Sequence, residues 1–343
     1  MCLNYIFIET FRPYIFFKDW SKIGFVILIS SFVSILFTGV LKKYAFKFSL
    51  YQRIENGRDQ NKPMVRLGGI AIFSSFFLIY FFCRYFFDFN LNSSSYDIFP
   101  FPALILGTTC IFFIGIIDDL IYLSPKIRLF FQFIIGILVW SYGLRFGNIH
   151  IDFFGLGFDE LTLHPFLNLF FTVVFLVGMT NAINWIDGLD GLASGNIGIG
   201  SVAISLIILF SNSPIEYLLL PLCLAGCSFG FLFYNFYPAK IYMGDGGSNF
   251  LGFIFASLSI LISQKSTLSI NLLTILFLNF LPIINMSIVI IERFLNNLSP
   301  FYPDKRHIHH KMLNRGLTHK KSVILLYLLT FICSSLAIII QKV

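Results

Sequence analysis

Blocks of apolar residues, separated by short polar segments, recur along the whole chain. A helix needs roughly 20 apolar residues to cross a bilayer. Residues 5–17 are apolar but short and interrupted by charge and proline, so 1–22 is expected to be an interfacial N-terminal segment, with an eleventh span as the alternative. The remaining blocks predict ten transmembrane helices, at about 23–41, 67–87, 99–117, 128–146, 166–183, 193–210, 217–235, 249–264, 268–292 and 322–340.

The composition agrees with this pattern. Hydrophobic residues make up 57% of the chain and charged residues 12%, whereas a soluble domain carries about 25% charged residues. This balance excludes a soluble globular protein, a disordered chain and a collagen-like chain. Since no repeat or low-complexity linker divides the sequence, we predict an all-α polytopic membrane protein with one integral membrane domain over residues 1–343.

Positive charge is concentrated on one side of the predicted bundle. Ten spans put both termini on the same side, and 17 of the 24 Lys and Arg residues fall in loops of the opposite side. Because basic loops are retained in the cytoplasm, these loops are predicted to be cytoplasmic and the termini to lie outside. The net charge of +7 then reflects membrane orientation, and no nucleic-acid partner is expected.

Two adjacent carboxylates, Asp118 and Asp119, end one apolar helix on the cytoplasmic side. Ionising both beside lipid is costly unless a cation compensates them. A divalent metal ion or a nearby Lys would do so, and Lys126 and Arg128 follow in the same loop. A solvated helix end is the plainer interpretation, but acidic residues at a helix C-terminus oppose the macrodipole.

The next cytoplasmic loop carries two Asn and two Asp at spacings of three, in the run from Asn181 to Asp190. On a helical stretch this spacing brings the side chains to one face. Two glycines in the same loop let a ligand approach the backbone closely. A plain turn needs one Asp-Gly pair and this loop has two, which favours a functional role.

A glycine-rich segment, Gly244 to Ser248, leads into a further apolar helix. Free N–H groups and the positive end of the helix dipole are expected here, and both suit a phosphate. Asp245 within the segment suits Mg²⁺, a hard cation that prefers carboxylate oxygen. A simple helix cap formed by Asp245 or Ser248 is the alternative.

The last cytoplasmic loop holds a basic, histidine-rich run from Pro303 to Lys311. Three His beside three Lys and Arg residues suit anion binding or proton transfer. Zinc is disfavoured because the run has no Cys partners and no pair of His at i and i+4. Contact of a polybasic segment with anionic lipid remains as the alternative.

Together these loops place acidic clusters suited to a metal ion and basic clusters suited to phosphate at one lipid boundary. A soluble phosphorylated donor cannot enter hydrocarbon and a lipid phosphate cannot leave it, so the two would meet at this interface. Joining two phosphate groups brings like charges together. Mg²⁺ with Lys, Arg and His would neutralise that repulsion.

In this order the motifs resemble those of the polyprenyl-phosphate N-acetylhexosamine-1-phosphate transferases, over about residues 60–320. The likeness is greatest to the branch that begins O-antigen, enterobacterial common antigen or teichoic acid synthesis. The matching motifs are Arg66-Leu-Gly68-Gly69, Asp118-Asp119, Lys126-Ile-Arg128, the run from Asn184 to Ala193, the run from Met243 to Ser248, and Ser299-Pro300 through Leu317.

The resemblance implies transfer of N-acetylhexosamine-1-phosphate from a UDP-sugar to undecaprenyl phosphate in the bacterial plasma membrane. The products would be a lipid-linked diphosphate sugar and UMP, and the reaction would require Mg²⁺, or Mn²⁺ in its place. N-acetylglucosamine is the sugar expected first, with N-acetylfucosamine and N-acetylquinovosamine as alternatives. The sequence does not decide between a monomer and a homodimer.

The resemblance also implies roles for individual residues. Asp245 and Asp118 would bind the metal ion, and Asp118 or Asp119 would deprotonate the acceptor or attack as a nucleophile. In-line attack by the lipid phosphate on the donor's β-phosphate is preferred because it needs mainly positioning and charge neutralisation. The UDP-sugar would contact Asn184, Asp187, Gly188, Leu189, Asp190, Asn235 and Tyr242, the last two near the uracil. Phosphate or acceptor would contact Lys126, Arg128, Arg306, His307, His309 and His310.

Three residues depart from the family's usual pattern. Gln60 replaces a common His, Val65 a common Pro, and Asn285 a common Asp. Loss of the carboxylate at Asn285 is expected to change a salt bridge or the sugar preference, but it leaves the metal-site motifs intact, so activity is still expected. The order His-Ile-His-His at 307–310 argues against the peptidoglycan branch.

Two functions of other classes stay open at this point. Near-membrane carboxylates on many spans also fit an ion-coupled transporter, although such carriers place charges near mid-membrane and show repeats. Gln60 and Asn285 suggest an inactive scaffold of a glycan assembly complex.

Overall fold

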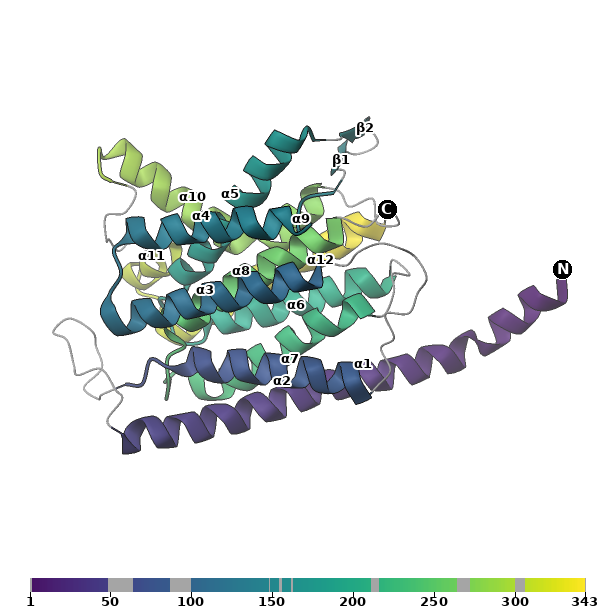
Figure 1. The fold of residues 1–343 in the computed structure, drawn as a ribbon, viewed down its shortest axis with the longest axis horizontal. Helices are drawn as coiled ribbons and strands as arrows, with labels where there is room; N and C mark the ends of the chain where they lie inside the picture. Colours follow the sequence, from purple (N-terminus) through teal and green to yellow (C-terminus); the bar gives the residue numbers. More distant parts are fainter. Residues whose placement is uncertain are drawn as a thin grey trace.

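The fold, taken from a computed structural model, is a bundle of helices that run broadly along one direction (Figure 1). It describes residues 2–48, 64–86, 100–147, 149–153, 156–161, 163–210, 216–263, 272–299 and 306–342. Gln60 lies outside these residues. The helices are α1 (Cys2–Lys47), α2 (Gly68–Phe86), α3 (Phe101–Ile121), α4 (Pro125–Ser141), α5 (Pro165–Ile186), α6 (Leu192–Phe210), α7 (Glu216–Asn235), α8 (Gly244–Ser263), α9 (Leu272–Leu278), α10 (Phe280–Leu295), α11 (Ile308–Asn314) and α12 (His319–Lys342).

Eight of the described helices are long and apolar enough to cross a membrane, namely α1, α2, α3, α5, α6, α7, α8 and α12. A ninth span would combine α9 and α10, which meet at a bend of 79°. The remaining predicted span, at about 128–146, corresponds to α4, which has 17 residues. The chain is thus a helical multi-pass membrane protein as predicted, with eight or nine spans by length and composition in the described part where about ten were expected.

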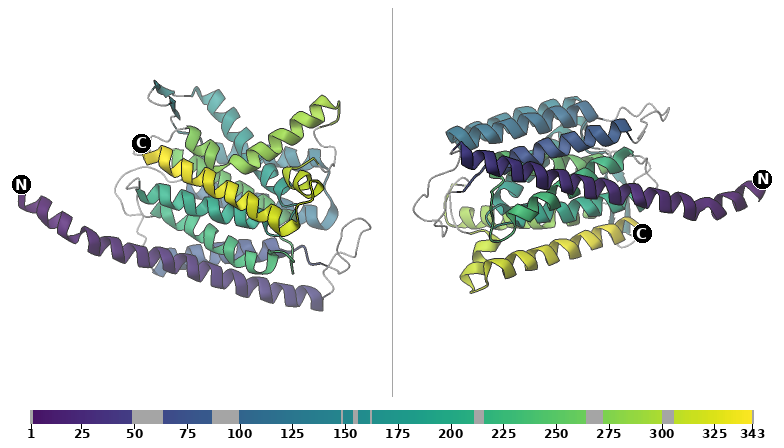
Figure 2. Two further views of the ribbon diagram at one scale, coloured as in Figure 1. Left: turned by 180° about the vertical axis from the view of Figure 1, so that it is seen from behind. Right: turned by 90° about the horizontal axis from the view of Figure 1, so that it is seen from below.

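The first helix is longer than the predicted span. α1 continues without a break from Cys2 to Lys47, and its N-terminal part projects beyond the bundle in both views of Figure 2. The expected segment 1–22 is therefore continuous with the first span from Cys2 onward. Its position at the membrane interface stays a prediction.

A second departure lies in the segment 147–165, between two of the predicted spans, for which no strand was predicted. Strands β1 (Ile149–Phe153) and β2 (Leu156–Leu161) pair there in antiparallel register, with Ile151 opposite Phe158. The sequence Ile-His-Ile-Asp-Phe of β1 alternates apolar and polar residues, which is the period of a strand.

The bend between α9 and α10 has a local cause. Pro282 cannot continue the helical ladder, and its ring clashes with the carbonyl four residues earlier. At the break, the Asn279 amide donates to the Ile275 carbonyl at 2.9 Å and to the Ser259 hydroxyl at 3.1 Å. These bonds satisfy polar groups that the interrupted ladder brings into an apolar interior.

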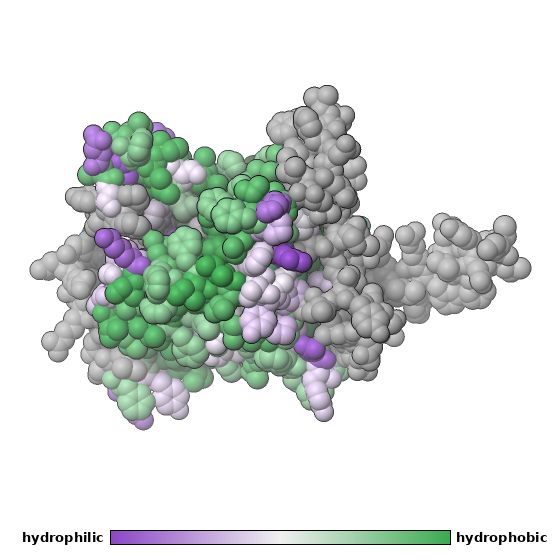
Figure 3. Space-filling model, turned by 45° about the horizontal axis from the view of Figure 1, so that its top comes forward, coloured by the Kyte–Doolittle hydropathy of each residue, from purple (hydrophilic) through white to green (hydrophobic). Residues whose placement is uncertain are grey.

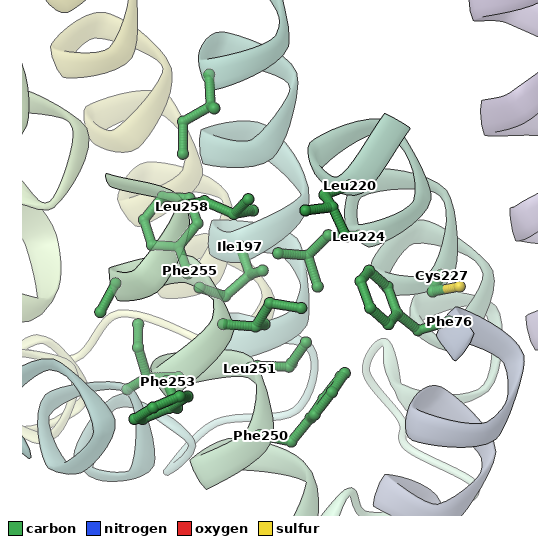
Figure 4. Close-up of a cluster of buried hydrophobic side chains, with 14 of the residues drawn as sticks. Phe76, Ile197, Leu220, Leu224, Cys227, Phe250, Leu251, Phe253, Phe255 and Leu258 are labelled. Atoms are coloured by element: carbon green, nitrogen blue, oxygen red, sulfur yellow. The ribbon is translucent and has the colours of Figure 1, made fainter. Parts of the chain in front are cut away.

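Helix α8 forms the centre of the bundle. Its apolar window is wholly buried, and α8 packs against α2, α3, α5 and α6. Figure 4 shows side chains of α2, α6, α7 and α8 in one cluster, including Phe76, Ile197, Leu224 and Phe250. Since lipid tails are as apolar as these side chains, close packing holds the helices together within the membrane.

The outer surface is apolar where lipid would touch it. Large exposed side chains include Phe130 on α4, Phe170 on α5 and Phe331 on α12. On the face shown in Figure 3, an apolar band is bounded by hydrophilic residues toward both ends of the bundle. Both chain termini lie at one end of the bundle, whereas α11 lies at the other (Figures 1 and 2). The candidate site is at the α11 end.

Candidate functional site

The segments that precede α2 and α8 are joined by backbone hydrogen bonds at the α11 end. Tyr242 N donates to the Val65 carbonyl at 2.9 Å, and Gly69 N donates to the Met243 carbonyl at 2.8 Å. A Cβ on Gly69 would lie 2.3 Å from the Gly247 nitrogen, so the two helices approach closely where glycines face each other. This contact brings Arg66 beside the α8 terminus.

Asp119 caps the N-terminus of α8. Its carboxylate accepts hydrogen bonds from Asp245 N at 2.9 Å and Gly246 N at 3.0 Å. An anion at a helix N-terminus is favoured by the dipole and by the unpaired N–H groups. The expectation that these N–H groups are free for phosphate is wrong for these two, because the chain's own carboxylate occupies them.

Asp118 is paired with Arg128 at the start of α4. Arg128 Nη1 lies 2.5 Å from one carboxylate oxygen of Asp118, and Leu123 N donates to the other at 2.7 Å. The Asp118 side chain is 5% exposed. Arg128 therefore compensates this carboxylate, and both oxygens of Asp118, the predicted metal ligand, accept hydrogen bonds.

Asp245 is the accessible carboxylate at the start of α8. Its side chain is 30% exposed, and its Oδ2 lies 3.8 Å from Arg128 Nη1. The Asn184 amide donates at 2.8 Å both to Asp245 Oδ1 and to the Ser248 hydroxyl. The last turn of α5 thus orients Asp245 directly.

Asp187 completes the acidic centre from the loop after α5. Burial raises the pKa of its carboxyl well above the usual range, the nearby Asp245 raises it further, and Arg66 lowers it. No hydrogen-bond donor to this carboxylate is found among the described residues. Asp187, Asp119 and Asp245 come from three separate motifs, so folding assembles carboxylates that are far apart in the sequence.

Arg66 also belongs to the site. It lies in one of the matching motifs, but it was not among the predicted contact residues. Its charge acts on both Asp119 and Asp187. The signal was present in the sequence, because Arg66 is the last basic residue before a helix and two glycines follow it.

Asn235 and Asp190 are buried residues that connect two loops of the site. Asn235 is buried; its carbonyl oxygen accepts from Gly191 N at 3.1 Å and its amide donates to the Ile241 carbonyl at 3.0 Å. Asp190 is also buried and accepts from Ala239 N at 2.9 Å. Both side chains therefore join the loop after α5 to the loop before α8. Their contact with the nucleotide stays a prediction.

Two residues of α12 hold the same loop and were missed. His319 Nε2 accepts from Asp190 N at 2.9 Å, and its ring stacks on Tyr237 at 4.5 Å between centroids. The Tyr327 hydroxyl donates to the Gly191 carbonyl at 2.5 Å. Neither residue belongs to a recognisable motif. Each contacts a partner more than 80 residues away, so the local sequence gives no sign of its role.

The remaining predicted contacts differ in exposure. Tyr242 is partly buried beside the α8 terminus, and Lys126 is exposed at the start of α4. Leu189 is buried. Tyr242 and Lys126 thus keep the accessibility that their predicted roles need, whereas the Leu189 side chain is part of the core.

The histidine run docks on the Asn184–Asp190 loop through His309. The ring of His309 is 1% exposed, and a Cβ on Gly188 would lie 2.2 Å from its Nε2. Burial, with the neighbouring His310 and His307, lowers the pKa of His309 to about 3. The lowered pKa favours the neutral ring at physiological pH. The predicted phosphate contact of His309 stays a prediction and would be made by a neutral ring.

Gly188→Ala should displace His309 and lower activity. The added methyl group overlaps the ring, and the α11 segment must shift to admit it. We expect a fall in turnover of about 10²-fold, since misplacement by about 1 Å near reacting groups has that effect, with a stability loss of about 1–3 kcal/mol. Gly24→Ala is the matched control, because a Cβ there meets nothing within 4 Å. Equal activity of the two variants would contradict this role.

His309 should make stability sensitive to acid. Because its folded pKa lies below the ordinary value of about 6.5, the unfolded chain binds more protons there as pH falls. Between pH 7 and pH 5 this costs the folded state about 2 kcal/mol. Over the same pH interval the free energy of unfolding of His309→Gln should fall by about 2 kcal/mol less than that of the wild type. Denaturant unfolding in micelles measures both. Parallel pH curves for the two proteins would refute the assignment.

The other members of the run lie around His309. Its ring is stacked against His307 at 5.4 Å and lies 4.4 Å from His310. Arg306 donates to the Glu292 carbonyl at 2.9 Å, and Lys311 forms an ion pair with the Glu292 carboxylate. The α11 segment is thus held against the end of α10 by its own basic residues.

Comparison with known proteins identifies the family. The pattern of glycosyl transferase family 4 matches residues 101–263, which include the α3 and α8 acidic residues. A probable undecaprenyl-phosphate N-acetylglucosaminyl 1-phosphate transferase of Bacillus subtilis is 36% identical, over 94% of this chain and 86% of its own. The chain belongs to the polyprenyl-phosphate N-acetylhexosamine-1-phosphate transferase family.

Relatives from other bacteria carry similar names. The undecaprenyl-phosphate alpha-N-acetylglucosaminyl 1-phosphate transferase of Escherichia coli K12 is 28% identical, over 92% of this chain and 83% of its own. The decaprenyl-phosphate N-acetylglucosaminephosphotransferase of Mycobacterium leprae is 32% identical, over 66% of this chain and 61% of its own. Membership of this transferase family disfavours the ion-coupled transporter.

Proposed function

We propose that this protein transfers N-acetylhexosamine-1-phosphate from a UDP-sugar to undecaprenyl phosphate and releases UMP. The relatives named above support the reaction class. The observation that carries the proposal is the meeting of Asp119, Asp187 and Asp245 with Arg66 and Arg128 at one end of the bundle. Such mixed charge at a lipid boundary suits two phosphate groups that must be brought together.

The bond changes follow from the products. An oxygen of the lipid phosphate attacks the β-phosphorus of the UDP-sugar, and the bond between that phosphorus and the oxygen bridging to the α-phosphate breaks. UMP leaves with the bridging oxygen and its electron pair. Positioning and charge neutralisation carry most of the catalysis of such a transfer.

A divalent ion fits the acidic centre. Among the described residues no three His, Cys, Asp or Glu side chains form a complete metal-binding group. Mg²⁺ usually takes one or two carboxylates and completes its shell with water and substrate phosphates. Asp245, which is accessible, and Asp187, whose carboxylate has no donor in the described part, would hold it. The ion would neutralise charge on the transferring phosphoryl group.

The chain's own residues then act as follows. Asp118 holds Arg128 beside Asp245, so that the guanidinium stands where phosphate charge accumulates. Asn184 fixes the rotamer of Asp245. Asp119 is already engaged by the α8 terminus. We therefore propose that the lipid phosphate attacks as its own anion, with Asp118 and Asp119 organising the site and neither serving as a base or nucleophile.

Substrate placement follows from exposure. Tyr242 is suited to stack on the uracil, since it is partly exposed beside the α8 terminus. Lys126 is suited to the phosphate of the lipid acceptor at the membrane boundary. The site would face the cytoplasm of a bacterial plasma membrane, where UDP-sugars are available, and the termini would lie outside. N-acetylglucosamine is the proposed first donor, in synthesis of O-antigen or another surface glycan.

UMP release tests the proposal. Purified protein in micelles is given undecaprenyl phosphate, Mg²⁺ and one UDP-N-acetylhexosamine at a time. We expect UMP with at least one donor, dependence on the lipid, and loss on chelation that added Mg²⁺ or Mn²⁺ reverses. Folded protein that releases no UMP with any donor would favour the scaffold hypothesis, in which Gln60 and Asn285 mark an inactive member.

A further inference from the structure

Asn285 lies at the contact between α10 and the histidine run. It is 1% exposed, although its side chain is polar. Its carbonyl oxygen accepts a hydrogen bond from Ile308 N at 3.0 Å, at the first residue of α11. Its amide nitrogen lies 3.3 Å from Nδ1 of His307. One side chain therefore holds both the start of α11 and one edge of an imidazole ring.

The Ile308 bond fixes which way the amide faces. A backbone N–H can only donate, so it must meet the carbonyl oxygen of Asn285, and the NH₂ group is left facing His307. An NH₂ group is only a donor, so Nδ1 of His307 must accept. The neutral ring then carries its proton on Nε2, and a doubly protonated ring would set Nδ1–H against an N–H of Asn285.

Aromatic rings and basic residues surround His307, and a positive charge on its ring would be unfavourable beside the basic ones. Trp185 packs edge-on to the ring at 5.7 Å, and the Arg293 guanidinium of α10 lies 4.9 Å from the Trp185 ring. The rings of His309 and His310 lie 5.4 and 6.1 Å from that of His307, and Arg306 directly precedes His307 in the chain. Glu292 is the nearest carboxylate on α10, and Lys311 and Arg306 are bound to that residue. Asp187 follows Trp185 by two positions and faces the acidic centre.

We propose that Asn285 is a positioning residue that holds His307 as a neutral imidazole with its proton on Nε2. The His307 ring then serves the site as a hydrogen-bond donor and not as a cation. This part of the inference rests on the proposed function: the His307 Nε2–H group would donate to a phosphoryl oxygen of the UDP-sugar. A neutral donor holds that oxygen without adding an electrostatic attraction that UMP must overcome when it leaves.

The tautomer is directly measurable. In protein labelled with ¹⁵N at its histidine rings, His307→Gln identifies the His307 signals, and nitrogen shifts report which ring nitrogen carries a proton. Nδ1 should be unprotonated and Nε2 protonated between pH 6 and pH 8. A wild-type ring with its proton on Nδ1, or a doubly protonated ring at pH 7, overturns the proposal whether or not any variant folds.

Asn285→Asp should reverse the preference. A carboxylate accepts from Ile308 N and from a protonated Nδ1 at once, so the His307 ring should take up its second proton at a pH higher by about one unit or more. Asn296→Asp is the charge-matched control, because Asn296 ends α10 and bonds the Glu292 carbonyl at 2.6 Å, with an exposed side chain. Equal titration of His307 in all three proteins would also overturn the proposal.

UMP release separates this proposal from the function on which it rests. We expect the rate against pH to gain a new titration in Asn285→Asp that wild type and Asn296→Asp lack. If no protein releases UMP, the transferase assignment fails and the spectra still decide the tautomer. If Asn285→Asp is active with an unchanged pH profile while its His307 is doubly protonated, the role of a neutral donor is refuted.

Discussion

Asp245→Asn should lower the rate of UMP release by about 10³-fold while the protein stays folded. Asn is nearly isosteric with Asp and keeps an oxygen that can accept from the Asn184 amide, which lies 2.8 Å from Asp245 Oδ1. The cap on α8 involves the backbone of Asp245 and the side chain of Asp119, so it survives the change. What is lost is the accessible negative charge that would hold a divalent ion.

The measurement is UMP release at saturating lipid and donor, together with the unfolding midpoint. Asp152→Asn is the matched control, since it removes the same charge from strand β1, at the far end of the bundle from the site. Equal rates for the two variants would remove Asp245 from the mechanism. A large loss of stability in Asp245→Asn alone would mean that the carboxylate is structural.

Asp119→Ala should destabilise the protein by about 3–5 kcal/mol and abolish activity. The change removes two hydrogen bonds to a charged acceptor, each worth about 1.5–3 kcal/mol, from N–H groups in a largely buried position. It also removes the anion that the α8 dipole favours. Activity falls because the freed terminus no longer holds Asp245 beside Arg128.

Unfolding of the purified protein in mixed micelles with rising SDS measures this effect. Ser124→Ala provides the comparison, because Ser124 caps α4 through a 3.4 Å bond to Ile127 N at an exposed position. It should cost at most about 1 kcal/mol. A loss no larger for Asp119→Ala than for Ser124→Ala would show that the α8 cap is not a major source of stability.

The fold class and the end of the bundle that carries the site could be predicted from local pattern alone. Apolar blocks about 20 residues long mark the helices, and all motifs fall on the side opposite the termini. The alternation in β1 and the position of Pro282 also carried information on the hairpin and on the bend between α9 and α10. Both signals are local, yet the pattern of apolar blocks alone predicted neither the hairpin nor the bend.

The partners of individual side chains could not be predicted in the same way. Asp119 and Gly246 are 127 positions apart, and Asp190 and His319 are 129 apart. A carboxylate that caps a distant helix and one that faces substrate have the same local sequence. The burial of Asn235 could not be predicted either, since it depends on the packing of α7 against the loop after α5 and the loop before α8. Residue type and spacing therefore indicated which loops matter, and the fold decides which side chains remain accessible.

Because α8 lies at the centre of the bundle, the geometry of the site should depend little on the thickness of the surrounding membrane. A bilayer that is too thin or too thick acts on the helices it touches, by tilting them or by deforming around them. α8 is screened from the acyl chains by its neighbours. Asp245 lies in the first turn of that screened helix, and Asp119 of α3 caps it. Changes in lipid length should therefore act first on a peripheral helix such as α1, whose apolar window is mostly exposed, while the acidic centre keeps its geometry, so that the same active site can work in membranes of different composition.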